Sequence, residues 1–200
     1  MINNTPKQII SKKRVVDHGE VFTAEREVQA MLDLVKYMPH NINDRFLEPS
    51  CGNGNFLIEI LRRKLSTVKL KYKKPIDKEF YALYALSTIY GVDILLDNIC
   101  NAKKRLYNEL LLFFNKSHTS QIPDNYWNSV NQILETNLIE GDMLDGLNKI
   151  IFREYSVPRM YYFKQKDYKL SDMIGNKGLF NDIKVKPILD IKLKHYLEIC

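Results

Sequence analysis

The stretch RFLEPSCGNGNFLIEIL, residues 45–61, combines a carboxylate, two glycines and an apolar run within a few positions. Gly52 and Gly54 carry no side chain, so a ligand can approach the main chain closely at this point. A helix that begins after them would offer free backbone N–H groups to the same ligand. Glu48 precedes the loop, and its carboxylate repels phosphate and attracts positive charge. These residues therefore predict a binding loop for a cationic small molecule.

Two phosphate-binding motifs share the glycine-rich character of this loop, and both fail on a specific residue. The dinucleotide fingerprint GxGxxG requires a third glycine where this chain has Leu57. The nucleoside triphosphate loop GxxxxGK[ST] requires a lysine that residues 52–58 lack. The sequence therefore favours neither phosphate ligand.

Patterns typical of strands and helices alternate around the loop. Short apolar segments at 45–49, 89–94 and 137–142 are expected to be strands, and residues 95–116 form the clearest amphipathic helix pattern. The helix expected directly after the loop has one face made of Phe56, Leu57, Ile60, Leu61 and Lys64. Alternation of this kind predicts an α/β fold with a parallel sheet and helices on both of its faces.

An acidic residue lies at the end of each expected strand. Glu48 is at the end of the first strand, Asp93 of the second and Asp142 of the third. Because the carboxyl ends of parallel strands meet at one edge of a sheet, ligands bind at that edge. We therefore expect one cleft to contain all three carboxylates.

The chain has the size of one compact domain, with 200 residues of which 45% are hydrophobic. Residues 1–20 are expected to form a basic N-terminal arm and residues 21–200 the domain. A helix pattern over residues 23–38 opens the domain, with Thr23 as its expected N-cap.

Composition excludes several classes of protein. The net charge of +6 is compatible with a polyanionic partner without requiring one. The three cysteines are scattered and odd in number, which argues against a disulfide framework and for a reducing compartment. The start lacks a secretory signal pattern, and no uninterrupted apolar stretch reaches about 18 residues. We expect a cytoplasmic protein with no membrane partner.

Four segments resemble, in order and spacing, the S-adenosylmethionine (AdoMet) dependent methyltransferases that act on the amino group of DNA adenine. FLEPSCGNGNFL resembles their first motif, and IYGVDILLDNICNAKKRL and NLIEGDML resemble their second and third. HGEVFTAEREVQAMLDLV resembles the segment that precedes the first motif in the modification subunits of restriction-modification systems, with Ala24 where proline is common. The resemblance covers roughly residues 11–145 and implies DNA methylation and a Rossmann-like class I methyltransferase sheet.

The resemblance also assigns parts of AdoMet to residues. The loop and the acid before it would hold the methionine portion, with Phe22 and Thr23 at its carboxylate. Asp93 would accept the ribose hydroxyls, Ile94 would pack on the adenine ring, and Asp142 with Met143 would contact the adenine amino group. Nothing in this set requires a metal. The implied cofactor-binding residues are Phe22, Thr23, Glu48, Pro49, Cys51, Gly52, Asn53, Gly54, Asn55, Phe56, Asp93, Ile94, Asp142 and Met143.

The fourth motif of that family, (Asn, Asp or Ser)-Pro-Pro-(Tyr or Phe), holds the flipped adenine, and this sequence contains no Pro-Pro pair. Pro158 with Tyr161 and Tyr162 is a poor substitute. FNDIKVKPILDI, residues 180–191, resembles the start of the fourth strand, but the target-recognition region that would follow is missing. We therefore expect a truncated fold that lacks the catalytic half, and no catalytic residue is assigned.

Three functions remain open. The chain is the AdoMet-binding part of a DNA adenine methyltransferase whose acceptor motif and target recognition lie on a second methyltransferase or specificity subunit. Alternatively, it is a catalytically degenerate AdoMet-binding or structural subunit of a restriction or defence complex, or a methyltransferase acting on RNA, protein or a small molecule. DNA binding would use Lys12, Lys13 and Arg14 and the lysines between 164 and 194.

Overall fold

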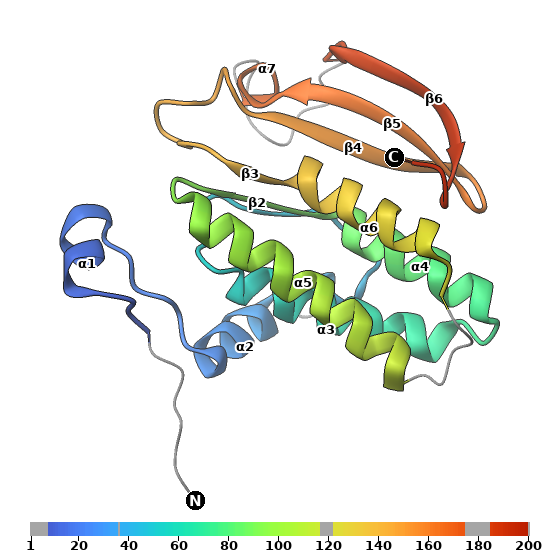
Figure 1. Cartoon of the computed structure of the whole chain (residues 1–200), viewed down its shortest axis with the longest axis horizontal. Coiled ribbons are helices and arrows are strands. Elements are labelled where there is room, and N and C mark those ends of the chain that lie inside the picture. Colours follow the sequence, from blue (N-terminus) through green and yellow to red (C-terminus); the bar gives the residue numbers. More distant parts are fainter. Residues whose placement is uncertain (1–7, 36, 117–121, 175–184, 200) are drawn as a thin grey trace, which may run out of the picture.

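A computed structural model gives the structure of the chain and describes residues 8–35, 37–116, 122–174 and 185–199 (Figure 1). It is a mixed α/β protein with a three-stranded parallel sheet flanked by helices. The strands are β1 (Phe46–Glu48), β2 (Ile89–Asp93) and β3 (Leu138–Glu140), in the order β1-β2-β3. Both pairings are parallel. The expectation of an α/β fold with a parallel sheet is confirmed.

Two helices connect each pair of successive strands. β1 is followed by α3 (Asn55–Lys71) and α4 (Pro75–Ser87), and β2 by α5 (Leu96–Lys116) and α6 (Asp124–Asn137). The expected face of the helix after the loop is confirmed for Leu57, Ile60, Leu61 and Lys64, which are all buried. Parallel strands require such long crossover connections, which place helices against the sheet.

Lys64 is a charged residue on that buried helix face and has no exposed surface. Its Nζ donates to the carbonyl oxygens of Ile42 (3.3 Å) and Asp44 (2.5 Å) and to Thr88 Oγ1 (2.5 Å). Burial lowers the pKa of Lys64 to about 7. These contacts fix the chain before β1 to α3 and to the end of α4, and so help to position the loop after β1.

The second face of β2 contacts a strand instead of a layer of helices. Tyr90 and Val92 pack against Ile150 and Phe152, at the start of β4 (Ile151–Arg159). This differs from the expectation of helices on both faces, because the chain after β3 turns back across the sheet. In Figure 1, α3 and α5 lie on the opposite side of β2 from β4.

The C-terminal region forms a separate antiparallel sheet. β4 pairs with β5 (Tyr162–Lys169), a short helix α7 (Leu170–Ile174) follows, and β6 (Leu189–His195) pairs antiparallel with β5. The expected fourth parallel strand at 180–191 is therefore wrong for its described part, and residues 180–184 lie outside the described residues. Phe163 and Tyr196 of this region are buried against Phe80 of α4.

The N-terminal region is more ordered than the expected arm. Helix α1 (Lys12–His18) begins at Ser11, whose hydroxyl accepts from the N–H of Arg14, and ends at Gly19 in the left-handed conformation. Helix α2 (Glu25–Leu34) follows, and then a 3₁₀ turn, η1 (Met38–His40). The N-cap of α2 is Ala24, which makes no side-chain cap, so the expected Thr23 cap is wrong. No helix of the described residues has the length and apolar character needed to cross a membrane.

Candidate functional site

The loop between β1 and α3 requires its two glycines. Gly52 and Gly54 have φ values of 51° and 87°, a region that residues with side chains rarely adopt. A Cβ on Gly52 would lie 3.1 Å from the ring of Phe22, and one on Gly54 would lie 3.0 Å from the Cβ of Ala102. The glycines therefore allow both the tight turn and the close approach of the N-terminal segment and α5.

Backbone hydrogen bonds connect this loop to the end of β2. The N–H of Cys51 donates to the carbonyl of Val92 (2.9 Å), and the N–H of Gly52 donates to Asp93 Oδ2 (2.8 Å). The other carboxylate oxygen of Asp93 accepts from the N–H of Leu95 (3.0 Å) and the amide of Asn98 (3.1 Å). Asp93 is only 6% exposed. A single carboxylate therefore holds together the loop, its own strand end and the start of α5.

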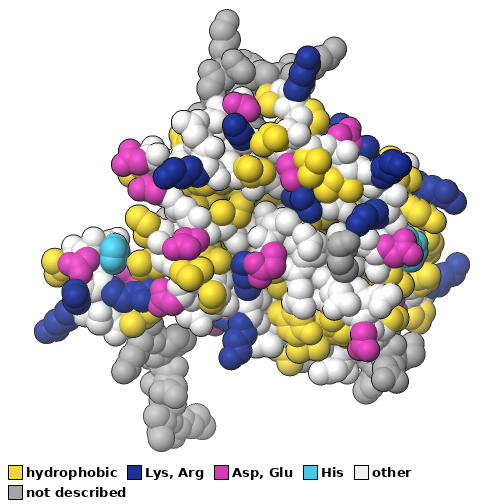
Figure 2. All heavy atoms as spheres, turned by 45° about the horizontal axis from the view of Figure 1, so that its top comes forward, with side chains coloured by type: hydrophobic (Ala, Val, Ile, Leu, Met, Phe, Trp, Pro, Cys, Tyr) yellow, Lys and Arg dark blue, Asp and Glu magenta, His cyan; other side chains and the backbone are white. Residues whose placement is uncertain are grey.

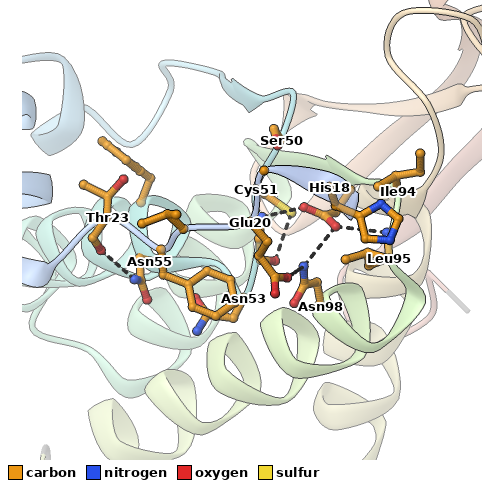
Figure 3. Close-up of a pocket in the computed structure, with 16 residues that line it drawn as sticks. His18, Glu20, Thr23, Ser50, Cys51, Asn53, Asn55, Ile94, Leu95 and Asn98 are labelled. Atoms are coloured by element: carbon orange, nitrogen blue, oxygen red, sulfur yellow. Dashed lines mark hydrogen bonds between the residues drawn. The ribbon is translucent and has the colours of Figure 1, made fainter. Parts of the chain in front are cut away.

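The N-terminal segment is joined to the same network. The amide of Asn98 also donates to Glu20 (2.7 Å), which accepts two hydrogen bonds from Arg14, each of 2.6 Å. Arg14 makes a second ion pair with Asp97 (2.5 Å). The guanidinium of Arg14 lowers the pKa of Glu20 below its usual range. The arm is thus docked beside Asp93, and Figure 3 shows Glu20 of the arm next to Asn98 of α5.

A cavity of about 130 Å³ lies between the docked segment, the loop and the end of β2. Figure 3 shows Glu20, Thr23, Asn53, Asn55 and Asn98 around it. It contains most of the predicted cofactor-binding residues, which come from three segments far apart in the sequence: Phe22, Thr23, Cys51, Gly52, Asn53, Asn55, Phe56, Asp93 and Ile94.

Five predicted residues do not line this cavity: Glu48, Pro49, Gly54, Asp142 and Met143. Glu48 is the last residue of β1 and is half-buried, and burial raises its pKa. Asp142 lines a different hollow, of about 370 Å³, and its Oδ1 accepts from the N–H groups of Leu144 (2.7 Å) and Asp145 (3.3 Å). The three acids therefore lie at the ends of three neighbouring strands, as predicted, but they do not share one cleft.

Cys51 packs inside the loop and has no feature of a nucleophile. Its side chain is 6% exposed, and its Sγ would lie 3.0 Å from a Cβ built on Gly91. Burial, together with the nearby Asp93 and Glu48, raises the pKa of Cys51 to about 12. The thiol is therefore uncharged at neutral pH and serves packing.

A second and larger cavity, of about 670 Å³, adjoins the first. The two share Phe22, Thr23, Asn53 and Asn55. The amide of Asn55 donates to the carbonyl of Thr23 (2.8 Å), and its oxygen accepts from Arg105 (2.8 Å). The pair of cavities therefore forms one polar region on both sides of the Phe22–Thr23 backbone.

Sequence reasoning missed three residues of this region: Glu20, Asn98 and Arg105. Glu20 belongs to the segment HGEVFT, so the resemblance contained the signal for it. Asn98 and Arg105 lie in a helix whose pattern indicates only an amphipathic surface element. Their contacts reach segments 78 and 50 or more residues away.

Comparison of the chain with protein-family models, with curated proteins and with solved structures found no match in any of the three.

Proposed function

We propose that this chain binds AdoMet and is the cofactor-binding portion of a DNA adenine methyltransferase of the restriction-modification type. The observation that carries the proposal is the left-handed Gly52–Gly54 loop, which lies between the carboxylates of Glu48 and Asp93 at the ends of β1 and β2. A bare backbone between two acids suits a ligand that has a sulfonium and an ammonium group, together with hydroxyl donors. The order β1-β2-β3 is compatible with a Rossmann-like class I sheet.

Each part of AdoMet has a partner in the proposed mode of binding. Glu48 lies outside both cavities, but its charge reaches Cys51 of the loop and attracts the positive charge of the methionine portion. Thr23 and the N–H groups at the start of α3 contact the polar atoms of that portion. Asp93 accepts the ribose hydroxyls; it receives three hydrogen bonds in this structure, and a carboxylate offers about four acceptor sites. Ile94, which is 53% exposed, packs on the adenine ring. Asp142 and Met143 contact the adenine amino group after a movement of their turn.

The size of the site supports binding across both cavities. The first cavity, of about 130 Å³, is smaller than the ~300 Å³ at which ligand pockets begin. The adjoining cavity adds about 670 Å³ and shares four residues with it. We infer that the ligand extends past the Phe22–Thr23 segment, and that this segment shifts when the ligand enters.

Bound AdoMet would supply an electrophilic methyl group, and this chain would bind it, orient it and exclude water. The segment that was a poor substitute for the acceptor motif belongs to the antiparallel sheet. Pro158 and Tyr162 lie in the β4–β5 hairpin, and Tyr161 forms its turn with φ 67° and donates to Asp77 (2.6 Å). A second chain with an acceptor motif therefore completes the enzyme in this proposal.

The experiment is transfer of a labelled methyl group from AdoMet to adenine in duplex DNA. We expect no transfer by this chain alone, and transfer when it is combined with a second chain that has the Asn-Pro-Pro-Tyr type of motif and a target-recognition region. Transfer by this chain alone would contradict the division of the enzyme. AdoMet binding without transfer in any combination would favour the alternative of a degenerate subunit of a restriction or defence complex.

DNA contact by this chain is a weaker part of the proposal. Arg14 is occupied by Glu20 and Asp97, and Lys164 by Asp190. On the face drawn in Figure 2, lysine and arginine side chains are interspersed with acidic and apolar ones. Lys12 and Lys13, in the first turn of α1, are exposed basic residues. Retention on DNA that falls steeply as salt rises would support contact with phosphates, whereas retention independent of salt would exclude it.

A further inference from the structure

Arg105 lies on α5, at the boundary between the glycine loop and the larger cavity. It is half-buried, and its Nη1 donates to the carbonyl oxygen of Asn53 (2.7 Å) and to Asn55 Oδ1 (2.8 Å). Both contacts use one nitrogen of a guanidinium that has five N–H donors. The side chain also lines the larger cavity. Arg105 therefore has donors available beside the loop.

The charge of Arg105 is not neutralised by any carboxylate of the described residues within ion-pair distance. Arg62, which lines the same cavity, is paired with Glu25 (2.7 Å) and Glu109 (2.7 Å). Burial and the neighbouring Arg62 lower the pKa of Arg105. A half-buried cation without a counterion is unfavourable, and an anionic ligand group would relieve that cost.

Asn53 supplies the complementary feature. Its side-chain Oδ1 is buried and has no hydrogen-bond partner among the described residues. Asn53 lines both cavities, and its backbone carbonyl is the atom that Arg105 binds. Buried acceptors are nearly always paired in proteins. An acceptor without a partner on the loop and a cation without a carboxylate partner on α5, in contact with each other through the Asn53 carbonyl, match the ammonium and carboxylate of an α-amino acid head group.

We propose that Arg105 binds the α-carboxylate of the methionine portion of AdoMet, while Asn53 accepts from its ammonium group. The inference rests on the proposed function and extends it, because the resemblance assigns the carboxylate to Phe22 and Thr23 alone. Thr23 lines both cavities and is joined to Arg105 through Asn55. Arg105 thus selects amino-acid-bearing nucleosides over nucleosides that lack the carboxylate.

The test compares two ligands that differ only in the carboxylate, AdoMet and decarboxylated AdoMet, by titration calorimetry. The wild-type protein should bind AdoMet more tightly. In Arg105→Met the affinity for AdoMet should fall roughly 10- to 100-fold, while the affinity for decarboxylated AdoMet changes less than about threefold. Arg63→Met is the matched control and should leave the preference between the two ligands unchanged, because Arg63 lines neither cavity and already has two carboxylate partners, Asp33 and Glu59.

Three results separate the possible failures. An equal loss of affinity for both ligands in Arg105→Met would overturn the inference, because Arg105 would then only stabilise the conformation of the loop. Unchanged affinity for AdoMet in Arg105→Met would overturn it as well. If the wild type binds neither ligand, the proposed function itself fails, and the inference fails with it. Should Arg105→Met not fold, as judged by circular dichroism, Arg105→Lys keeps the charge and should retain the preference for AdoMet.

Discussion

The ends of β2 and β3 are each marked by an aspartate, the last residue of β2 and the second residue after β3, yet the two differ in what surrounds them. Asp93 is 6% exposed and binds donors from the glycine loop, from its own strand end and from α5. Asp142 is half-buried and binds two N–H groups of its own turn. An acid at a strand end is therefore a weak indicator by itself. Contacts with distant segments distinguish an organising residue from one that caps a turn.

The N-terminal segment causes much of this difference. It lies over the end of β2, where Glu20 and Asn98 join it to Asp93. The end of β3 has no such cover among the described residues, and the chain continues from there into the antiparallel sheet. The four predictions below test whether the two strand ends differ in ligand binding as they do in structure.

The largest effect is expected for Asp93→Asn. The amide would put an NH2 group in place of one carboxylate oxygen, facing either the N–H of Gly52 or the donors of Leu95 and Asn98. The hydrogen bonds to the remaining oxygen would lose their charge assistance. We expect AdoMet affinity to fall at least about 100-fold and the free energy of unfolding to fall by about 2–3 kcal/mol. Asp142→Asn keeps an acceptor oxygen, so its AdoMet affinity should fall by less than about threefold. Titration calorimetry measures the affinity, and urea denaturation measures the free energy of unfolding. Equal losses of affinity in the two variants would show that the ends of β2 and β3 do not differ in ligand binding.

Gly52→Ala tests whether close packing between the loop and the N-terminal segment is needed for AdoMet binding. The new Cβ would press on the ring of Phe22 at 3.1 Å, so AdoMet affinity should fall about 30-fold. Gly19→Ala is the control, because Gly19 also has positive φ but a Cβ there would contact nothing within 4 Å. Both variants should lose about 1–2 kcal/mol of stability from backbone strain. A similar loss of affinity in both would remove the specific role of the contact with Phe22.

The pH dependence tests Glu48. Burial raises its pKa in the free protein, and a cationic ligand favours the ionised form. AdoMet affinity should therefore rise as the pH rises through that pKa and then level off, with proton release on binding. The stability of the ligand-free protein should depend on pH in the opposite direction to the affinity. The stabilising contribution of Glu48 is fully present below its unfolded pKa of about 4.3, and it is lost as the pH rises through the pKa of the folded state.

The control for this pH effect is Glu48→Gln. Near neutral pH the variant should bind AdoMet about tenfold more weakly than the wild type. Its affinity should not change between pH 5 and 8, and it should equal the affinity of the wild type with Glu48 protonated. Calorimetry in buffers of different ionisation enthalpy measures the proton release. If Glu48→Gln shows the same pH dependence of AdoMet affinity as the wild type, another group causes the pH effect.

The smallest effect is expected for Arg14→Gln, which removes the ion pairs that dock the arm. AdoMet affinity should fall about threefold, mainly through faster dissociation, because the segment over the site opens more often. Arg153→Gln removes a comparable ion pair with Asp167 in the antiparallel sheet and should leave the dissociation rate unchanged. Stopped-flow displacement of a fluorescent AdoMet analogue separates the two. Equal rates for Arg14→Gln and the wild type would show that the arm does not cover the bound ligand.

The parallel half of the fold could be predicted because its signals are local. The strand before Gly52 and the amphipathic face that includes Lys64 are visible in short windows of sequence, and the structure confirms both. The N-terminal helix was missed although Ser11 is a typical N-cap followed by helix-forming residues. The many charges of residues 1–20 indicate a basic arm and conceal this helix signal.

The antiparallel half could not be predicted in the same way. β5 is mostly polar and charged, and its buried positions include Gln165 beside Phe163, so the usual apolar alternation of a strand is hidden. Its pairing with β4 depends on a turn at Tyr161 that has no glycine. The contacts of the candidate site could not be predicted from the sequence either. The contacts of Asn98 with Glu20 and of Arg105 with Asn53 join segments far apart in the chain, and one sequence does not contain that information.

The most direct test of the central claim is a calorimetric titration of the wild-type protein with AdoMet, run at two temperatures so that a zero enthalpy at one of them does not hide binding. The account predicts saturable binding to one site per chain, lost in Asp93→Asn and retained in Asp142→Asn. No heat and no thermal stabilisation at either temperature would contradict it.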